Sequence, residues 1–152
     1  MAANNKNDFD KVRSQLDQGR VAVMEAAASL SGIDLAAAHL KRLTYYQTWR
    51  EFMENYDLVL TPTLPLGAFP TGLDQPGSVA GKPTNYLSWT AFTYPFNLTG
   101  QPAATVPCGF DRNGLPLGLQ IVGRYRDDAT VLRAAAAFEA IAPWSHLRPP
   151  VD

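Results

Sequence analysis

Prolines within an apolar segment restrict this chain more than any other feature of its sequence. Residues 94–109, YPFNLTGQPAATVPCG, hold three prolines among sixteen mostly apolar residues. Proline fixes φ near about −65° and donates no backbone hydrogen bond. We therefore expect Pro95 to stop a helix, Pro102 to fix a turn into a strand, and Pro107 to end that strand. Asn97, in the irregular piece between them, is expected to satisfy buried backbone groups.

Hydrophobic spacing along the rest of the chain predicts an α/β fold. Apolar residues recur at three- and four-residue steps in some segments, and short apolar runs bounded by proline or glycine indicate strands. Asn113-Gly114 is the strongest short hairpin signal, so its flanking strands should pair antiparallel. The nearly continuous apolar run 117–122 favours a strand buried on both faces. We predict about three strands in a mixed sheet, at 57–61, 103–107 and 117–122, and four to five helices, at about 9–30, 35–55, 86–93 and 129–141.

Helix ends are predicted from capping residues. Asp34 is expected to be the N-cap of the second helix, and the Asp127-Asp128 pair should open the last one. Gly19 is expected to interrupt the first helix or to end a first short helix.

A long irregular segment, residues 62–85, follows the first predicted strand. It contains five prolines and four glycines. Loops of this length are often lids or binding loops, but a solvent-side connector has the same composition, and the sequence leaves both readings open. Its run GSVAGKP is one residue short of a phosphate-binding loop and has proline where that loop needs a hydroxyl. A phosphate site is therefore not expected.

Composition and charge exclude several classes of protein. A 152-residue chain with 46% hydrophobic and 18% charged residues fits one globular domain. A net charge of −1 without a basic stripe argues against nucleic acid as a partner. No apolar run reaches the ~20 residues of a membrane helix, and the start MAANNKNDFDKVR lacks a signal-peptide core. One cysteine, Cys108, fits a reducing compartment, so a cytoplasmic protein without a membrane partner is expected.

The residues alone reveal no catalytic constellation. His39 and His146 have no evident partner, so they do not support a Ser-His-Asp arrangement. The two histidines and the cysteine have no metal-ligand spacing, and neither a metal nor another cofactor is expected. Cys108 has no nearby base and is interpreted as a small buried hydrophobic residue.

Several motifs follow one another in the second half of the chain. They are Leu-Thr-Pro-Thr, Pro-Phe-Asn-Leu-Thr-Gly-x-Pro, Val-Pro-x-Gly and Gly-Leu-Pro-x-Gly-Leu-Gln, before a final helix opened by acidic residues. This order closely resembles the C-terminal part of the amidase signature family, the serine amidohydrolases that include bacterial amidases and the A subunit of the tRNA-dependent amidotransferase. The resemblance covers at least residues 40–142. It implies one C-terminal segment of an amidase domain over residues 1–152, with a helical hairpin at 1–55 and a strand–loop–hairpin–helix part at 56–152.

The resemblance also implies that the catalytic groups lie outside this sequence. The family's nucleophile is a serine assisted by a second serine and a lysine, which come from a Gly/Ser-rich signature and an upstream lysine. Ser31-Gly32 and Gly77-Ser78 lack that context, and none of the four lysines can be matched to the catalytic one. No residue is therefore assigned a catalytic role. We expect a segment that contributes sheet and acyl-pocket residues to an amide hydrolase and is inactive alone.

Four residues are implied as substrate contacts near the acyl side of the family's site: Thr61, Trp89, Phe92 and Asn97. Residues 89–94 contain no carboxylate, whereas the A subunit of an amidotransferase is expected to use one there for the amino group of glutamine. This favours a general amidase acting on an apolar or aryl amide.

Other interpretations remain open. The chain could belong to the A subunit of an amidotransferase, or it could be a non-catalytic binding module derived from an amidase. Trp89 and Phe92 also fit simple core packing, because aromatic residues at helical spacing are more often buried than functional. The expected partner in the full-length enzyme is a small-molecule amide. Unpaired strand edges and exposed apolar faces predict self-association of the segment itself.

Overall fold

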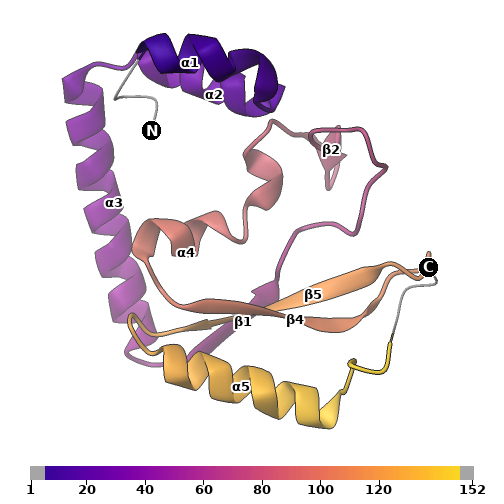
Figure 1. The fold of residues 1–152 in the computed structure, drawn as a ribbon. Helices are drawn as coiled ribbons and strands as arrows, with labels where there is room; N and C mark the ends of the chain where they lie inside the picture. Colours follow the sequence, from indigo (N-terminus) through magenta and orange to yellow (C-terminus); the bar gives the residue numbers. More distant parts are fainter. Residues whose placement is uncertain (1–5, 148–152) are drawn as a thin grey trace. The chain divides into compact units, whose positions relative to one another are not determined.

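The computed structural model describes residues 6–147 (Figure 1). By its internal contacts the chain forms two compact units: residues 1–40 with 69–89, and residues 41–68 with 90–152. The second unit contains a three-stranded sheet packed against helices, which confirms the predicted α/β class. The proposed division of the chain at residue 55 stays a prediction.

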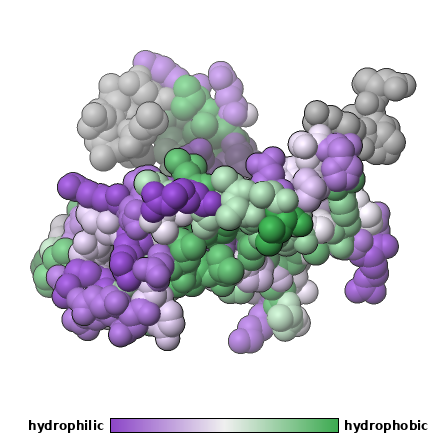
Figure 2. All heavy atoms as spheres, turned by 90° about the horizontal axis from the view of Figure 1, so that it is seen from below, coloured by the Kyte–Doolittle hydropathy of each residue, from purple (hydrophilic) through white to green (hydrophobic). Residues whose placement is uncertain are grey.

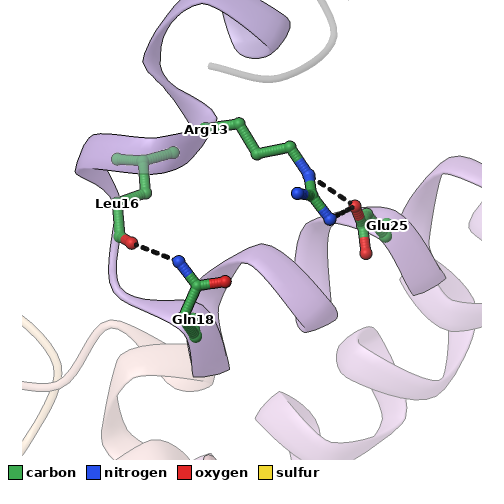
Figure 3. Close-up of polar contacts among 4 residues, drawn as sticks. All are labelled: Arg13, Leu16, Gln18 and Glu25. Carbon is green, nitrogen blue, oxygen red and sulfur yellow. Dashed lines mark hydrogen bonds and ion pairs between the residues drawn. The ribbon is translucent and has the colours of Figure 1, made fainter.

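The first unit begins with a broken helix. The segment predicted as one helix over 9–30 contains α1 (Lys6–Val12), the 3₁₀ turn η2 (Arg13–Gln15) and α2 (Gln18–Ala28). The break lies before Gly19, because the Asp17 carboxylate accepts a hydrogen bond from the Arg20 backbone N–H at 2.9 Å and so caps α2. Across the break, Arg13 pairs with Glu25 at 2.7 Å and the Gln18 amide donates to the Leu16 carbonyl (Figure 3).

The long helix α3 (Gly32–Met53) starts with a reciprocal cap. Asp34 was expected to be its N-cap, but the structure assigns that place to Ser31. The Ser31 hydroxyl accepts from the Asp34 backbone N–H at 3.2 Å, and the Asp34 carboxylate accepts from the Ser31 backbone N–H at 2.9 Å. Because the two residues satisfy each other's backbone donors, the helix begins three residues earlier than predicted.

The irregular segment after the first strand contains a small hairpin of its own. The strands β2 (Ser78–Val79) and β3 (Lys82–Pro83) pair antiparallel. Their turn has positive φ at both central residues, 48° at Ala80 and 75° at Gly81. The Thr84 hydroxyl donates to the Pro76 carbonyl and closes the base of this hairpin.

The second unit is built on one antiparallel sheet. Its strands are β1 (Leu58–Pro62), β4 (Ala103–Phe110) and β5 (Pro116–Gly123), in the order β1-β5-β4. The three predicted strands are present, but the described strands do not mix directions, because β5 pairs antiparallel with both β1 and β4. The short turn at Asn113-Gly114 can join β4 to β5 only antiparallel. Pro107 does not end β4: it lies opposite Gly118 on an edge strand, and a bulge between Pro107 and Gly109 carries the strand onward.

Each face of this sheet is covered by a different helix (Figure 1). The last helix, α5 (Asp128–Ile141), packs on one face, where Val106, Ile121 and Val131 form the buried cluster. Asp127 caps α5 through the Thr130 backbone N–H, as the acidic pair predicted. Figure 2 is viewed from the side on which α5 lies in Figure 1, and hydrophobic side chains gather in the middle of that face.

The helix on the opposite face, α4 (Tyr94–Thr99), was not predicted. Residues 86–93 were predicted to be helical, with Pro95 as the stop, but the structure has only the 3₁₀ turn η3 (Ser88–Thr90) there. Pro95 lies in the first turn of α4, where a missing N–H costs nothing because that turn has no intrahelical acceptor for it. Gly100, with φ of 75°, ends α4.

Candidate functional site

A row of polar side chains crosses the sheet on the face opposite α5. In the strand register Gln120 of β5 lies between Thr61 of β1 and Thr105 of β4. Side chains alternate between faces along a strand. Since Ile121 and Leu119 pack with α5, Gln120 points to the other face. The same alternation places Thr61 and Thr105 there, so three polar residues stand side by side on three strands.

Gln120 is the centre of this row. Its side chain is 4% exposed, and its Nε2 donates to the Thr61 hydroxyl and to the Phe92 carbonyl, both at 2.9 Å. The carbonyl can only accept, so the amide nitrogen must be the atom that faces it. A buried amide is costly unless it is hydrogen-bonded, and both N–H groups of Gln120 are used.

A pair of hydroxyl groups continues the polar row. Thr63 and Thr105 lie with their Oγ1 atoms 2.6 Å apart. Gly118 lies beneath them: a β-carbon built at Gly118 would stand 2.7 Å from the Thr63 Oγ1. The glycine therefore leaves room for the hydroxyl pair on the sheet.

A cavity of about 340 Å³ opens beside this row. None of the described residues that line it is charged, so it suits an uncharged group. Its wall combines one aromatic ring and two alanines with hydroxyl and amide side chains, from Thr63, Thr93, Asn97, Gln101, Thr105 and Gln120.

Asn97 lies at this cavity but does not act as predicted. Its side chain is exposed, and within residues 6–147 it makes no hydrogen bond to the backbone groups that it was expected to satisfy. The segment is helical, so the backbone satisfies itself: the Asn97 N–H donates to the Thr93 carbonyl at 3.3 Å. This leaves the Asn97 amide free to meet another molecule.

The other predicted contacts are divided between the two units. Gln120 brings Thr61 and the Phe92 backbone together in the second unit, where the Phe92 ring is 36% exposed. Trp89 belongs to the first unit and packs edge-to-face on Phe69 with ring centroids 5.4 Å apart. The buried Trp89 Nε1 has no hydrogen-bond partner among the described residues.

Gln120 was not among the predicted site residues. It appeared in the sequence only as part of an apolar run and of a recognised motif. The signal that could have found it is the presence of one amide in a strand of otherwise apolar or glycine residues, because such an amide needs partners from other segments.

A second cavity, of about 490 Å³, lies between α3 and the segments around Gln101 and Arg124. Its aromatic wall is formed by Tyr46, Trp49 and Tyr125. Of its polar side chains, Arg50 pairs with Glu54 at 2.9 Å, and Gln101, which lines both cavities, donates from its amide to the Gly123 carbonyl at 3.0 Å.

Among residues 6–147 no group of three or more acidic, histidine or cysteine side chains could hold a metal ion. Cys108, which was expected to be buried, is exposed at the β4 bulge. No single described helix is long and apolar enough to cross a membrane; the bent pair α2 and α3 satisfies that test only when its two helices are taken together, by length and composition.

The model of the Amidase family matches residues 4–132. The chain belongs to the amidase family. Within that family it is 40% identical over 144 residues to an acylamidase of Rhodococcus erythropolis, covering 93% of this chain and 30% of the relative. It is 44% identical over 110 residues to the A subunit of the glutamyl-tRNA(Gln) amidotransferase of Brevibacillus brevis, covering 71% of this chain and 21% of the relative.

A solved amidase structure has the same fold. A bacterial aryl acylamidase of the amidase signature family matches with a TM-score of 0.78 and 31% sequence identity, over 88% of this chain and 28% of that chain. The chain thus spans less than a third of the length of these relatives. It has part of an amidase fold, and the motifs that predicted the family are those that build β1, α4, β4 and β5.

Proposed function

We propose that this chain is the C-terminal part of an amidase, which in its full-length form hydrolyses a carbon–nitrogen amide bond through a serine acyl-enzyme. The observation that carries the proposal is the acylamidase relative, because its 40% identity extends over 93% of the chain. The match to the amidotransferase relative covers 71% of the chain. The lack of a carboxylate in residues 89–94 also favours an acylamidase over an amidotransferase.

In this proposal the chain does not carry out the bond cleavage. It has no Gly/Ser-rich signature and no lysine that matches the family's catalytic one. The serine, the second serine and the lysine would come from the rest of the enzyme. The chain contributes strands to the sheet and a wall to the site that holds the acyl group.

The proposed substrate contacts are Thr61, Trp89, Phe92 and Asn97. Phe92 offers a partly exposed ring and Asn97 a free amide. The Trp89 indole N–H is buried and has no hydrogen-bond partner within the described residues. Uncharged groups of this kind suit a neutral apolar or aryl amide, since no cation or carboxylate is offered to a charged acyl group. The partner proposed for the complete enzyme is such a small molecule, and the proposed location is the cytoplasm.

The first test of the proposal is the coding sequence of the gene. The sequence upstream of this chain should encode the two serines and the lysine. The complete protein should then hydrolyse an anilide, while purified residues 1–152 should show no turnover above background. Absence of the serine–serine–lysine set, together with binding of small amides without hydrolysis, would identify a non-catalytic binding module instead. Hydrolysis of glutamine in preference to anilides would identify a component of an amidotransferase.

The acyl contacts are tested in the complete enzyme by Trp89→Ala and Phe92→Ala. A hydrophobic pocket discriminates by roughly 10- to 200-fold in kcat/KM for a methylene-sized change. Each substitution should therefore alter the preference among acyl groups. Reaction with a small activated ester should survive, because the activating groups lie elsewhere. An unchanged preference in a folded enzyme would mean that these aromatic side chains only pack in the core.

A further inference from the structure

Gln120 makes two hydrogen bonds that the packing of its strand does not require. An apolar residue at this position would continue the run of β5 on the sheet. Instead the strand buries an amide, with both N–H groups committed to other segments: to Thr61, 59 positions away in sequence, and to Phe92, 28 positions away. A residue that joins three separate segments constrains their relative positions.

The hydrogen bond from Gln120 gives the Phe92 carbonyl a donor that no backbone N–H provides. Phe92 lies between η3 and α4, and within residues 6–147 no backbone N–H donates to its carbonyl. The first carbonyl used by α4 is that of Thr93, which accepts from the Asn97 N–H. The Gln120 amide is therefore what holds the Phe92 backbone against the sheet.

We infer that Gln120 is a positioning residue that sets the acyl preference of the proposed site. It fixes the Phe92 backbone and the Thr61 hydroxyl at one separation on the sheet, and the Phe92 ring extends from that fixed backbone. Gln120 acts through Phe92 and need not touch the substrate. The inference rests on the proposed function for the identity of the site, whereas the link between Gln120 and Phe92 is testable in this chain alone.

The link is tested by Gln120→Met, which keeps the length of the side chain and removes both donors. Gln47→Met is the matched control, because Gln47 is exposed on α3 and its one side-chain hydrogen bond within the described part of the chain is accepted from the Arg50 Nε at 2.9 Å. Losing one hydrogen bond of about 1 kcal/mol corresponds to about a fivefold change in a local opening equilibrium. The backbone amides of residues 91–94, 96 and 97 should exchange with solvent about fivefold faster in Gln120→Met and be unchanged in Gln47→Met. Unchanged exchange in Gln120→Met would overturn the inference.

The effect on preference is tested in the complete enzyme by the ratio of kcat/KM for an acetyl and a benzoyl anilide. Gln120→Met should change this ratio several-fold. If Gln120 were merely structural, kcat/KM for both anilides would fall together and their ratio would stay constant. A constant ratio would overturn the inference even if amide exchange in this segment became faster.

Gln120→Glu should make the ratio of kcat/KM for the two anilides depend on pH. The buried carboxyl faces the Phe92 carbonyl, so only its protonated form can donate to that oxygen. Burial and this hydrogen bond both raise the pKa of the introduced carboxyl. The ratio of kcat/KM for the two anilides should therefore return towards the parent value as the pH falls. Ionisation of the catalytic nucleophile affects both substrates equally and cancels in this ratio. A pH-independent ratio would count against the inference. If no form of the complete enzyme is active, the proposed function fails, and the exchange experiment still decides whether Gln120 holds Phe92.

Discussion

Arg124, which follows β5, donates from its Nε to the carbonyl oxygen of Met53, the last residue of α3, at 3.0 Å. The same nitrogen lies 3.1 Å from the Tyr56 carbonyl, and Nη2 pairs with Asp57 at 3.0 Å. The last carbonyls of a helix lack intrahelical donors. Arg124 therefore caps the C-terminus of α3 from a distant strand and joins that helix end to the sheet.

This contact predicts that Arg124→Met destabilises the chain by about 1–3 kcal/mol, because the Met53 carbonyl loses its charged donor and keeps only the long hydrogen bond from the Tyr56 N–H at 3.4 Å. The matched control is Arg133→Met, since Arg133 is exposed on α5 and, among residues 6–147, donates only to the Thr130 hydroxyl three residues earlier. Urea unfolding of the three proteins measures the difference. Equal midpoints for the two variants would mean that the cap contributes nothing.

We predict that Gly19→Ala stabilises or destabilises the chain depending on whether the Tyr86 ring is present. A β-carbon at Gly19 would stand 2.1 Å from Cδ2 of the Tyr86 ring, which is not the flexible end of a side chain. Gly19 is the second residue of α2, and alanine in place of glycine, where the backbone conformation allows it, stabilises a chain by about 0.4–1 kcal/mol. We expect Gly19→Ala to destabilise the parent chain because the ring must move, and to stabilise a Tyr86→Ala background by about that amount. Additive effects in this double-mutant cycle would contradict the contact.

We predict that the Asp111 carboxylate stabilises the fold at neutral pH and that this stabilisation is lost in acid. The Leu115 backbone N–H, and then that of Asn113, hold the pKa of this carboxyl below its usual value. A lowered native pKa means that the stabilisation is fully present above the unfolded carboxyl's pKa and is lost as the pH falls through the native one. The stability difference between the parent and Asp111→Ala should therefore be constant at neutral pH and shrink below about pH 4. Thermal unfolding between pH 7 and acid measures it, and a stability difference that stays the same in acid would contradict the prediction.

Structure that depends on neighbouring residues could be predicted from the sequence, whereas contacts between distant residues could not. The turn at Asn113-Gly114 and the cap at Asp127 follow from neighbouring residues, and both were predicted correctly. Pro95 was misjudged because proline fits the first turn of a helix as well as it ends one, and the sequence alone does not decide between these roles. The partners of Gln120 lie 28 and 59 residues away, so only the folded sheet brings them together.

The final prediction is that the purified chain self-associates. Both outer strands of the described sheet, β1 and β4, have one edge without a strand partner within residues 6–147. Leu60 on β1 is 60% exposed, and Leu132 and Ile141 on α5 are 65% and 82% exposed. Unpaired edges next to exposed apolar side chains favour pairing with another chain.

Light scattering at tens of micromolar should therefore give a mass above the 16.6 kDa of one chain. Leu60→Lys should weaken the association, because a charge on an edge strand opposes pairing. Thr48→Lys adds the same charge to the exposed surface of α3, away from the edge, and should leave the association unchanged. A monodisperse 16.6 kDa species that binds no hydrophobic dye would show instead that these surfaces are stable in water without a partner.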